Sequence, residues 1–376
     1  MKEAKYDSNI LYNFPILLII KSSHILKTSQ STVLFSYLNK DVYSVTLEND
    51  RGMKVCLSNY GGLIQSIILP DKFNNYIDVV LGFDHLRDYI STDYLAHYPY
   101  FGAIIGRYAN RIANARFPLN GQIVKVSPNT PPHQLHGGFS GFDKKVWDIV
   151  SVKTAPGPMA TFRYVSKDGE EGFPGNLSVN ITFQLNNSNE LTLKIEAHTD
   201  KATAINMTHH GYFNLNGDAS SIEDHIVEIP ASHYLDQDVD YVSTGQLVAV
   251  DNTAHDFRKA KRIGHNWKVG EGYDQGFVLD KSLGVWGTAA TAFSAQTGIK
   301  LEVSTDQPGV QFYTGKYVNV RNGKKRMHYR PFTSFCFETQ QHTNAVNIPQ
   351  FPNTILEPGD KYLHTVTYKF SVDKNI

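Results

Sequence analysis

The chain has 376 residues, which allows one or two domains around a large core. Lysines and arginines number 36, and aspartates and glutamates also number 36, so there is no basic excess for nucleic acid and no acidic tail. The two cysteines, Cys56 and Cys336, are too few for a disulfide framework and indicate free thiols, as in a reducing compartment. Tyrosine and phenylalanine, at 21 each beside 28 glycines, favour strands and turns over helices.

The N-terminus begins with an apolar stretch from Ile10 to Ile20 that is short for a membrane span. It is similar to the apolar part of a secretory signal, but Asn13 and Pro15 interrupt it and no small-residue cleavage site follows. We therefore expect residues 1–40 to be an extension, either disordered or signal- or anchor-like, before a single domain over residues 41–376. A cytoplasmic location is expected, with secretion or membrane anchoring as alternatives.

The first predicted strands form a hairpin. Residues 42–47 and 54–58 flank the turn sequence E-N-D-R-G. Residues 63–69 and 77–82 favour two further strands, and residues 85–90 favour one or two helical turns.

The strongest pattern in the chain is an alternation of apolar and polar residues from Leu177 to Leu185. After a turn at residues 186–190 the alternation resumes, which predicts an antiparallel hairpin with one face on a core. Shorter segments predict strands of the same kind at residues 299–303, 310–314, 335–338 and 365–372. Since no long helical period or fixed repeat occurs, the sequence predicts an all-β fold, a large antiparallel β-sandwich.

Basic and polar side chains stand within a small, apolar run at residues 102–117, where Arg107, Asn110 and Arg111 occur. A buried arginine needs acceptors, which sugar hydroxyls, a carboxylate or a structural salt bridge would all supply. His136 precedes two glycines that would let the backbone approach a ligand closely. No strand–loop–helix pattern surrounds them, so we expect no nucleotide site.

Two adjacent histidines, His209 and His210, lie in the stretch N-M-T-H-H-G-Y-F-N-L, and an imidazole can exchange protons near neutral pH. On a strand they point to opposite faces, so only one can face a cleft. Glu338 ends an apolar run, where a carboxylate is costly without a partner or a role. The histidines, including His133 and His136, match no zinc spacing, so no metal is expected.

Six motifs in order give the chain its family resemblance: G-R-Y-A-N-R-I-A-N from residue 106, L-H-G-G from 135, N-M-T-H-H-G-Y-F-N-L from 206, Y-D-Q-G-F-V-L from 273, Q-P-G-V-Q-F-Y-T-G from 307 and F-E-T-Q ending at 340. From about residue 43 to residue 372 the chain resembles the aldose 1-epimerases, also called galactose mutarotases. The resemblance implies a β-sandwich of the galactose mutarotase type with an open sugar-binding cleft. It also implies interconversion of the α and β anomers of free aldohexoses such as glucose and galactose, with no cofactor.

The resemblance also implies residue roles. His210 matches the family's general acid and Glu338 its general base. Six residues fall on sugar-contact positions: Asn110, Arg111, His136, Tyr212, Asp274 and Gln311. His209 stands where relatives usually have asparagine and is assigned no catalytic role. The chain departs from the family pattern at Gly211, usually serine, and at Gln275, Gly276, Thr343 and Asn344, which puts the preferred sugar in doubt.

Anomer exchange by ring opening needs a base at the C1 hydroxyl and an acid at the ring oxygen. We expect an ionised Glu338 and a protonated His210, with a nearby carboxylate, Asp274 being the candidate, raising the pKa of the histidine.

Three alternatives remain at this point. A hexose-6-phosphate 1-epimerase would need a further cation in the cleft, such as Arg107 or Lys316. A non-catalytic carbohydrate-binding module would lack the acid or the base. A glycoside hydrolase with two carboxylates would leave His210 without a role. The expected partner is a free monosaccharide, with no nucleic acid and no nucleotide. The sequence leaves the oligomeric state open between a monomer and a homodimer.

Overall fold

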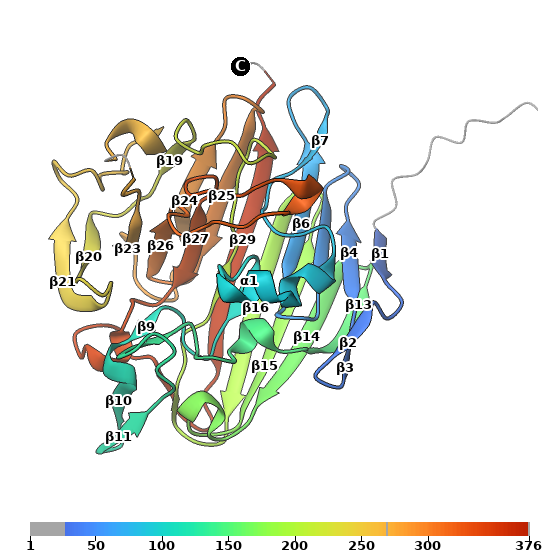
Figure 1. The fold of residues 1–376 in the computed structure, drawn as a ribbon. Helices are drawn as coiled ribbons and strands as arrows, with labels where there is room; N and C mark the ends of the chain where they lie inside the picture. Colours follow the sequence, from blue (N-terminus) through green and yellow to red (C-terminus); the bar gives the residue numbers. More distant parts are fainter. Residues whose placement is uncertain (1–26, 268–269, 375–376) are drawn as a thin grey trace, which may run out of the picture.

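The computed structural model describes residues 27–267 and 270–374, and most of them lie in antiparallel strands (Figure 1). The largest sheet has nine strands. In spatial order they are β13 (Asp148–Lys153), β14 (Met159–Ser166), β15 (Leu177–Leu185), β16 (Glu190–Thr199), β29 (Tyr362–Val372), β25 (Ile299–Thr305), β24 (Gly287–Phe293), β19 (Ile226–Glu228) and β22 (Lys261–Arg262).

The predicted hairpin is confirmed as β15 and β16, which pair antiparallel from Leu177 with Thr199 to Leu185 with Leu191. In β15 every apolar residue of the alternation is buried and every polar one is half-exposed. Because side chains on a strand alternate between its two faces, the sequence of β15 alone places one face of the large sheet against a core.

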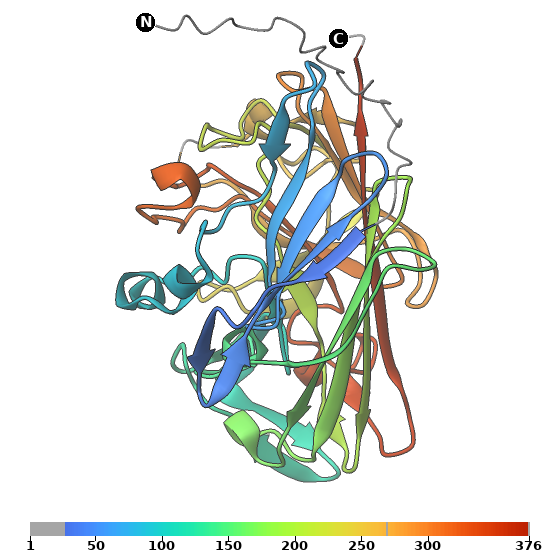
Figure 2. The ribbon, with the colours of Figure 1, turned by 90° about the vertical axis from the view of Figure 1, so that its right-hand side faces the viewer.

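Two five-stranded sheets form the opposing layer. One consists of β1 (Lys27–Gln30), β4 (Ser44–Glu48), β5 (Lys54–Ser58), β6 (Ile64–Pro70) and β7 (Tyr76–Asp78). The other consists of β21 (Ser243–Ala249), β20 (His233–Gln237), β23 (Asp274–Val278), β26 (Gly309–Tyr313) and β27 (Cys336–Gln340). The first contacts β14 and β15 through β4, and the second contacts β24 through β26. In the edge-on view the large sheet lies to one side and the other elements to the other (Figure 2). The predicted all-β sandwich is therefore confirmed.

Short two-stranded ribbons lie outside these three sheets. They pair β2 (Phe35–Tyr37) with β3 (Lys40–Val42), β8 (Ala103–Ile105) with β18 (Thr208–His210), β9 (Arg111–Ile112) with β12 (Gln134–Leu135), β10 (Arg116–Leu119) with β11 (Gln122–Lys125), and β17 (Thr203–Ala204) with β28 (Ile355–Leu356). Single 3-10 turns are η2 (Ala113–Ala115), η3 (Phe142–Lys144), η4 (Glu170–Gly172), η5 (Ile263–His265), η6 (Lys324–Arg326) and η7 (Ala345–Asn347).

Helix is scarce. The helical turns expected at residues 85–90 are present as the 3-10 helix η1 (Leu86–Ile90), followed by α1 (Thr92–Ala96). Ser91 caps α1 because its side chain accepts a hydrogen bond from the backbone N–H of Tyr94. The strand expected over residues 77–82 is shorter than predicted and ends at Asp78, whose carboxylate accepts the N–H groups of Ile67 and Val80.

The N-terminal region differs from the sequence-based expectation. Within the expected extension, β1 pairs with β4, β2 pairs with β3, and Phe35 is buried in a core cluster. Residues 27–40 are thus part of the folded body. Residues 1–26, including the apolar stretch from Ile10 to Ile20, lie outside the described residues. Among the described residues, no helix is long and apolar enough to cross a membrane.

Candidate active site

Three neighbouring strands, β23, β26 and β27, bring polar side chains to one face of the second five-stranded sheet, which begins with β21. Gln311 lies opposite Glu338 in the register of β26 and β27, and Tyr313 lies opposite Cys336. Asp274 pairs with Tyr313 from the other side. Because residues two apart on a strand share a face, Gln311 and Tyr313 lie on the same face of β26. The Gln311 Nε2 group donates a hydrogen bond of 2.7 Å to Oδ1 of Asp274, which links two strands of this face.

Strand β18 approaches β27 and carries His210 to this face. The Thr208 hydroxyl donates a hydrogen bond of 2.8 Å to the carbonyl oxygen of Thr339, which ties the two strands together. The Nε2 atom of His210 then lies 3.6 Å from Oε1 of Glu338, and both side chains are at most 5% exposed. On its other side, Nδ1 of His210 lies 3.6 Å from the thiol sulfur of Cys336. The buried acid–base pair therefore comes from strands more than a hundred residues apart.

The two adjacent histidines point in different directions, as a strand requires. Nδ1 of His209 lies 3.0 Å from the hydroxyl of Tyr368 on β29, in the large sheet. His210 instead lines a cavity together with Tyr212, two residues further on. The predicted division of faces between the two histidines is confirmed.

The remaining predicted contacts come from the ribbon of β9 and β12. The backbone N–H of His136 donates to the carbonyl oxygen of Asn110, and the N–H of Asn110 donates to Nδ1 of His136. Asn110, His136 and Tyr100 have φ angles of 60°, 53° and 61°. Left-handed backbone at residues other than glycine is uncommon and costs free energy, and it concentrates at functional sites.

These segments enclose a cavity of about 200 Å³, lined by all eight predicted site residues: Asn110, Arg111, His136, His210, Tyr212, Asp274, Gln311 and Glu338. The sequence analysis missed its other lining residues: His97, Tyr98, Pro99, Tyr100, Leu135, Tyr313 and Tyr317. The signal for several of them was the aromatic run Y-L-A-H-Y-P-Y ending at Tyr100. The ring of Tyr100 stacks on His210 at 5.8 Å and 18°, and that of Tyr212 at 4.9 Å and 16°.

The pKa shifts of the two cleft residues His210 and Glu338 differ from the expectation. Burial lowers the pKa of His210 to about 3, with neighbouring His209 as a smaller cause. Burial also raises the pKa of Glu338 well above its usual value, and Asp274 adds to that rise. The expected effect of Asp274 on the histidine is wrong: the carboxylate acts on Glu338 instead. Both shifts favour the uncharged form of each side chain.

Several buried polar atoms in the cleft have no hydrogen-bond partner among the described residues. They are Nε of Arg111, Oε1 of Gln311 and Oε2 of Glu338. Leaving such atoms unpaired costs free energy, and native proteins rarely do so without a reason. One donor and two acceptors around a small cavity match a ligand that carries several hydroxyl groups.

Arg107 lies outside the cleft, although the sequence left its role open. Its guanidinium donates to the Ser166 hydroxyl and to the carbonyl oxygens of Ser166, Lys167 and Pro174. Of the two cations weighed for a phosphate group, neither Arg107 nor Lys316 lines the cavity. The requirement of a hexose 6-phosphate is therefore not met by these two residues.

Gly137 also serves the fold rather than a ligand. A Cβ atom there would lie 2.0 Å from the carbonyl oxygen of Gly106, and its φ is 87°. The expectation that this glycine lets the backbone approach a ligand is wrong, because the close approach is between two backbone segments.

His136, His210 and Glu338 offer ligand atoms within 4.8 Å of one another, which is the spacing of a potential metal site. However, Nδ1 of His136 accepts the Asn110 N–H, so the hydrogen of the neutral ring is on Nε2. The Nε2 atom of His136 is therefore a hydrogen-bond donor and offers no lone pair to a cation in this arrangement.

The profile of the family described as aldose 1-epimerase matches residues 43–369. The chain belongs to the aldose 1-epimerase family. A galactose mutarotase from Sus scrofa is 39% identical to it over 330 residues, which cover 87% of this chain and 93% of the relative.

Solved structures of the family have the same fold. A galactose 1-epimerase from Lactobacillus acidophilus superposes with a TM-score of 0.80 at 28% identity, covering 92% of this chain and 99% of that one. An aldose epimerase homologue from C. elegans gives a TM-score of 0.78 at 30% identity, covering 86% and 96%. The resemblance in the six motifs is thereby confirmed, and as a member of this family the chain is an isomerase that interconverts the anomers of aldoses.

Proposed function

We propose that the substrates of this aldose 1-epimerase are free aldohexoses, with glucose and galactose among them, and that Glu338 and His210 exchange the protons. The observation that carries the proposal is the buried pair itself. A carboxyl and an imidazole 3.6 Å apart border a cavity with unpaired polar atoms. Both groups can reach neighbouring oxygens of a single small molecule, as acid–base catalysis of ring opening requires.

In the ring-opening step, Glu338 as carboxylate removes the proton from the C1 hydroxyl. His210 as imidazolium donates its proton to the ring oxygen, the bond between C1 and that oxygen breaks, and C1 becomes an aldehyde. Rotation about C1–C2 presents the other face of the aldehyde. Closure then runs the same transfers in reverse, so each group ends in its starting state and no cofactor is consumed.

The single proton of the pair makes this sequence possible. In the free cleft, burial favours a proton on Glu338 over one on His210, because it raises the pKa of the carboxyl and lowers that of the imidazole. Its transfer to His210 creates an ion pair across 3.6 Å, which sugar hydroxyls stabilise by hydrogen bonding to the charged carboxylate. The working form therefore arises when substrate enters, without proton exchange with bulk water.

The other cleft residues orient the sugar in this proposal. Arg111 donates to ring hydroxyls through its unpaired Nε, while its guanidinium lies 5.3 Å from the Tyr241 ring. Asp274 and Gln311 are held by their mutual hydrogen bond and keep acceptor capacity toward the cavity. Asn110, His136 and Tyr212 complete the wall.

Polarimetry on freshly dissolved α-D-glucose and α-D-galactose tests the proposal. We expect purified protein to bring both optical rotations to equilibrium faster than buffer alone, in proportion to enzyme concentration. Heat-denatured protein is the control for adventitious catalysis. Rotation that decays at the spontaneous rate with both sugars would refute the assignment of substrates.

A further inference from the structure

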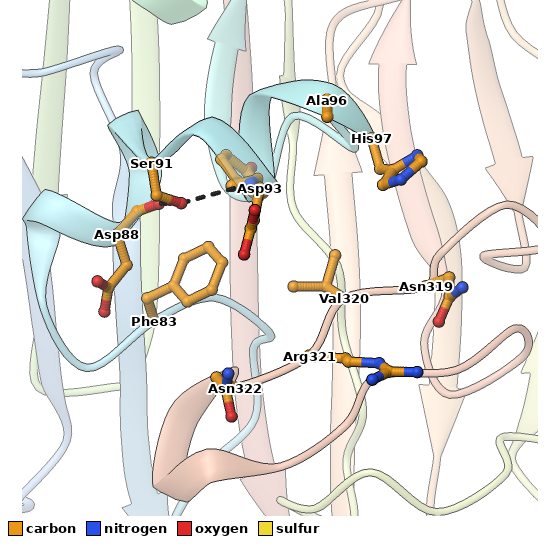
Figure 3. A pocket seen from close by; sticks show the side chains of 11 residues that line it. Phe83, Asp88, Ser91, Asp93, Ala96, His97, Asn319, Val320, Arg321 and Asn322 are labelled. Carbon is orange, nitrogen blue, oxygen red and sulfur yellow. Dashed lines mark hydrogen bonds between the residues drawn. The ribbon is translucent and has the colours of Figure 1, made fainter.

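The imidazole of His210 has aromatic rings packed against it and one polar group at each nitrogen. The rings belong to Tyr100, His136 and Tyr212. Nε2 faces the carboxyl of Glu338 and Nδ1 faces the thiol of Cys336, each at 3.6 Å. None of these residues lines the pocket that Figure 3 shows, which adjoins the cleft at His97. The hydrogen-bonding state of His210 is thus set by the groups at its own two nitrogens.

Cys336 takes no part in the proton transfers proposed above, although it touches the proposed acid. It is fully buried and precedes Glu338 by two residues on β27, so both side chains lie on one face of the strand. It does not line the cavity, so any effect on the substrate passes through His210. Burial raises the pKa of the thiol well above its usual value, and Glu338 and Asp274 add to the rise. Cys336 is therefore an uncharged thiol at neutral pH.

The proposed reaction requires a particular tautomer of His210. In ring opening, Nε2 gives its hydrogen to the ring oxygen, and in ring closure the same atom takes one back. A neutral imidazole has one nitrogen with a hydrogen and one with a free lone pair. Nδ1 must therefore keep its hydrogen throughout, because a neutral ring with the hydrogen on Nε2 has no lone pair there to accept the returning proton.

The sulfur of Cys336 is placed to accept the Nδ1–H hydrogen bond. A hydrogen bond to the backbone of His210 itself acts in the same sense, because it raises the pKa of the ring. A carboxylate at Nδ1 would stabilise the imidazolium and make it a weaker acid. Sulfur is a weak acceptor, so it can orient the Nδ1–H group while the imidazolium still gives up its other proton readily.

We propose that Cys336 is a positioning residue for the acid: its sulfur holds the hydrogen of the neutral His210 ring on Nδ1 and so leaves Nε2 free to exchange the reacting proton. The inference rests on the proposed function, in which His210 is the acid at the ring oxygen. Cys336 forms no bond to the sugar and stays a thiol in every step.

The test determines which nitrogen of His210 carries the hydrogen in the sugar-free protein at pH 7. Long-range proton–nitrogen correlation spectra of isotope-labelled enzyme distinguish the two tautomers, and the signals that are missing from His210→Asn identify the residue. We expect the hydrogen on Nδ1 in wild type. In Cys336→Ala the form with the hydrogen on Nε2 should appear. In Cys336→Ser, whose hydroxyl is again an acceptor, the wild-type form should partly return.

Glucose kinetics give the second readout. The kcat of Cys336→Ala should fall by about three- to tenfold, the effect of losing one weak hydrogen bond. Its KM should stay within about twofold of wild type, because Cys336 does not line the cavity. Cys336→Ser should have an intermediate kcat. Cys56→Ala is the matched control, since that thiol bonds to Oε1 of Gln65 in the other five-stranded sheet, and it should change neither tautomer nor kcat.

The same tautomer in wild type and Cys336→Ala would overturn the inference whatever happens to kcat, because lost packing alone leaves the hydrogen in place. A changed tautomer with unchanged kcat would overturn it as well. If Cys336→Ala does not fold, Cys336→Ser decides, and wild-type tautomer and kcat in that variant would count against the inference. A wild-type enzyme that accelerates neither glucose nor galactose would instead reject the proposed function, while the sugar-free spectra would still report the contact between Cys336 and His210.

Discussion

The ring of His209 occupies the space that a side chain at Gly211 would need. A Cβ atom on Gly211 would lie 2.6 Å from Cε1 and 3.1 Å from Nδ1 of His209. These two residues flank His210, and both are departures from the family pattern. The imidazole at one position and the missing side chain at the other therefore fit as a pair, and together they form the support behind the proposed acid.

Gly211→Ala should therefore destabilise the protein by about 1–3 kcal/mol, the usual cost of overpacking a buried site. The clash is with a ring held by Tyr368, so it cannot be relieved by a free rotation. Thermal unfolding measures the loss. In the double variant His209→Asn/Gly211→Ala the smaller side chain makes room, and the loss should be smaller than the sum of the two single changes. Strict additivity would contradict the pairing.

His210→Asn removes the proposed acid at the ring oxygen, and turnover of glucose should fall by roughly two to four powers of ten. His209→Asn is the matched control on the adjacent residue, and it should stay within a few-fold of wild type. Its side chain contacts Tyr368 rather than the cavity. Polarimetry at pH 7 on both variants decides between them. If the His209→Asn variant were inactive and the His210→Asn variant active, His209 rather than His210 would be the acid.

Glu338→Gln keeps the size of the side chain but removes its ability to accept a proton. We expect mutarotation to fall by roughly a hundredfold or more while sugar binding, measured by calorimetry, persists. Glu357→Gln, at an exposed position, serves as the control. Near-normal turnover in the Glu338 variant would show that another group is the base.

Asp274→Asn should move the alkaline limb of the pH profile. Asp274 raises the pKa of Glu338, so removing its charge lets the acid–base pair lose its single proton at a lower pH. Activity needs that proton, so kcat/KM should begin to fall at lower pH than in wild type. Asp224→Asn, an exposed residue outside the cleft, should leave the profile in place. An alkaline limb that stays fixed or moves upward in the Asp274 variant would contradict the coupling.

Two N-terminal truncations separate the folded body from what precedes it. Deleting residues 1–26 leaves every described strand in place and should preserve unfolding temperature and activity. Deleting residues 1–40 also removes β1, β2 and the buried Phe35, whose burial alone is worth about 1.5–3 kcal/mol. Calorimetry on both proteins checks this. Equal stability of the two truncations would mean that the pairing of β1 with β4 contributes nothing.

The sequence predicts best the strands whose own residues alternate between apolar and polar. In β15 the period of two determines both the strand and its buried face, because alternation needs no knowledge of distant residues. The site residues were found through the six motifs, and the structure gathers all eight around one cavity. By contrast, residues 27–40 lack a clear alternation and become strands through pairing with β4 and with each other.

Other features depend on tertiary surroundings that a sequence does not display. The pKa of His210 is lowered because the site is buried, whereas its charged neighbours alone suggested the opposite. Arg107 and Arg111 are four residues apart in one motif, yet one binds backbone carbonyls in the protein interior and the other lines the cleft. His97, Tyr98 and Tyr100 line the cavity because of the way their segment packs beside His210, where the Tyr100 ring stacks on the imidazole.

The stacking of Tyr100 and Tyr212 on His210 has a spectroscopic consequence. Ring currents from two nearly parallel aromatic faces shield the imidazole protons, so the Cε1–H signal of His210 should stand upfield of ordinary histidines in a proton NMR spectrum. The chain contains 15 histidines, and a displaced signal lets one of them be followed without labelling. A sugar entering the cleft would change the magnetic surroundings of that proton. The aromatic stack thus provides a built-in reporter of occupancy and protonation at the reacting centre.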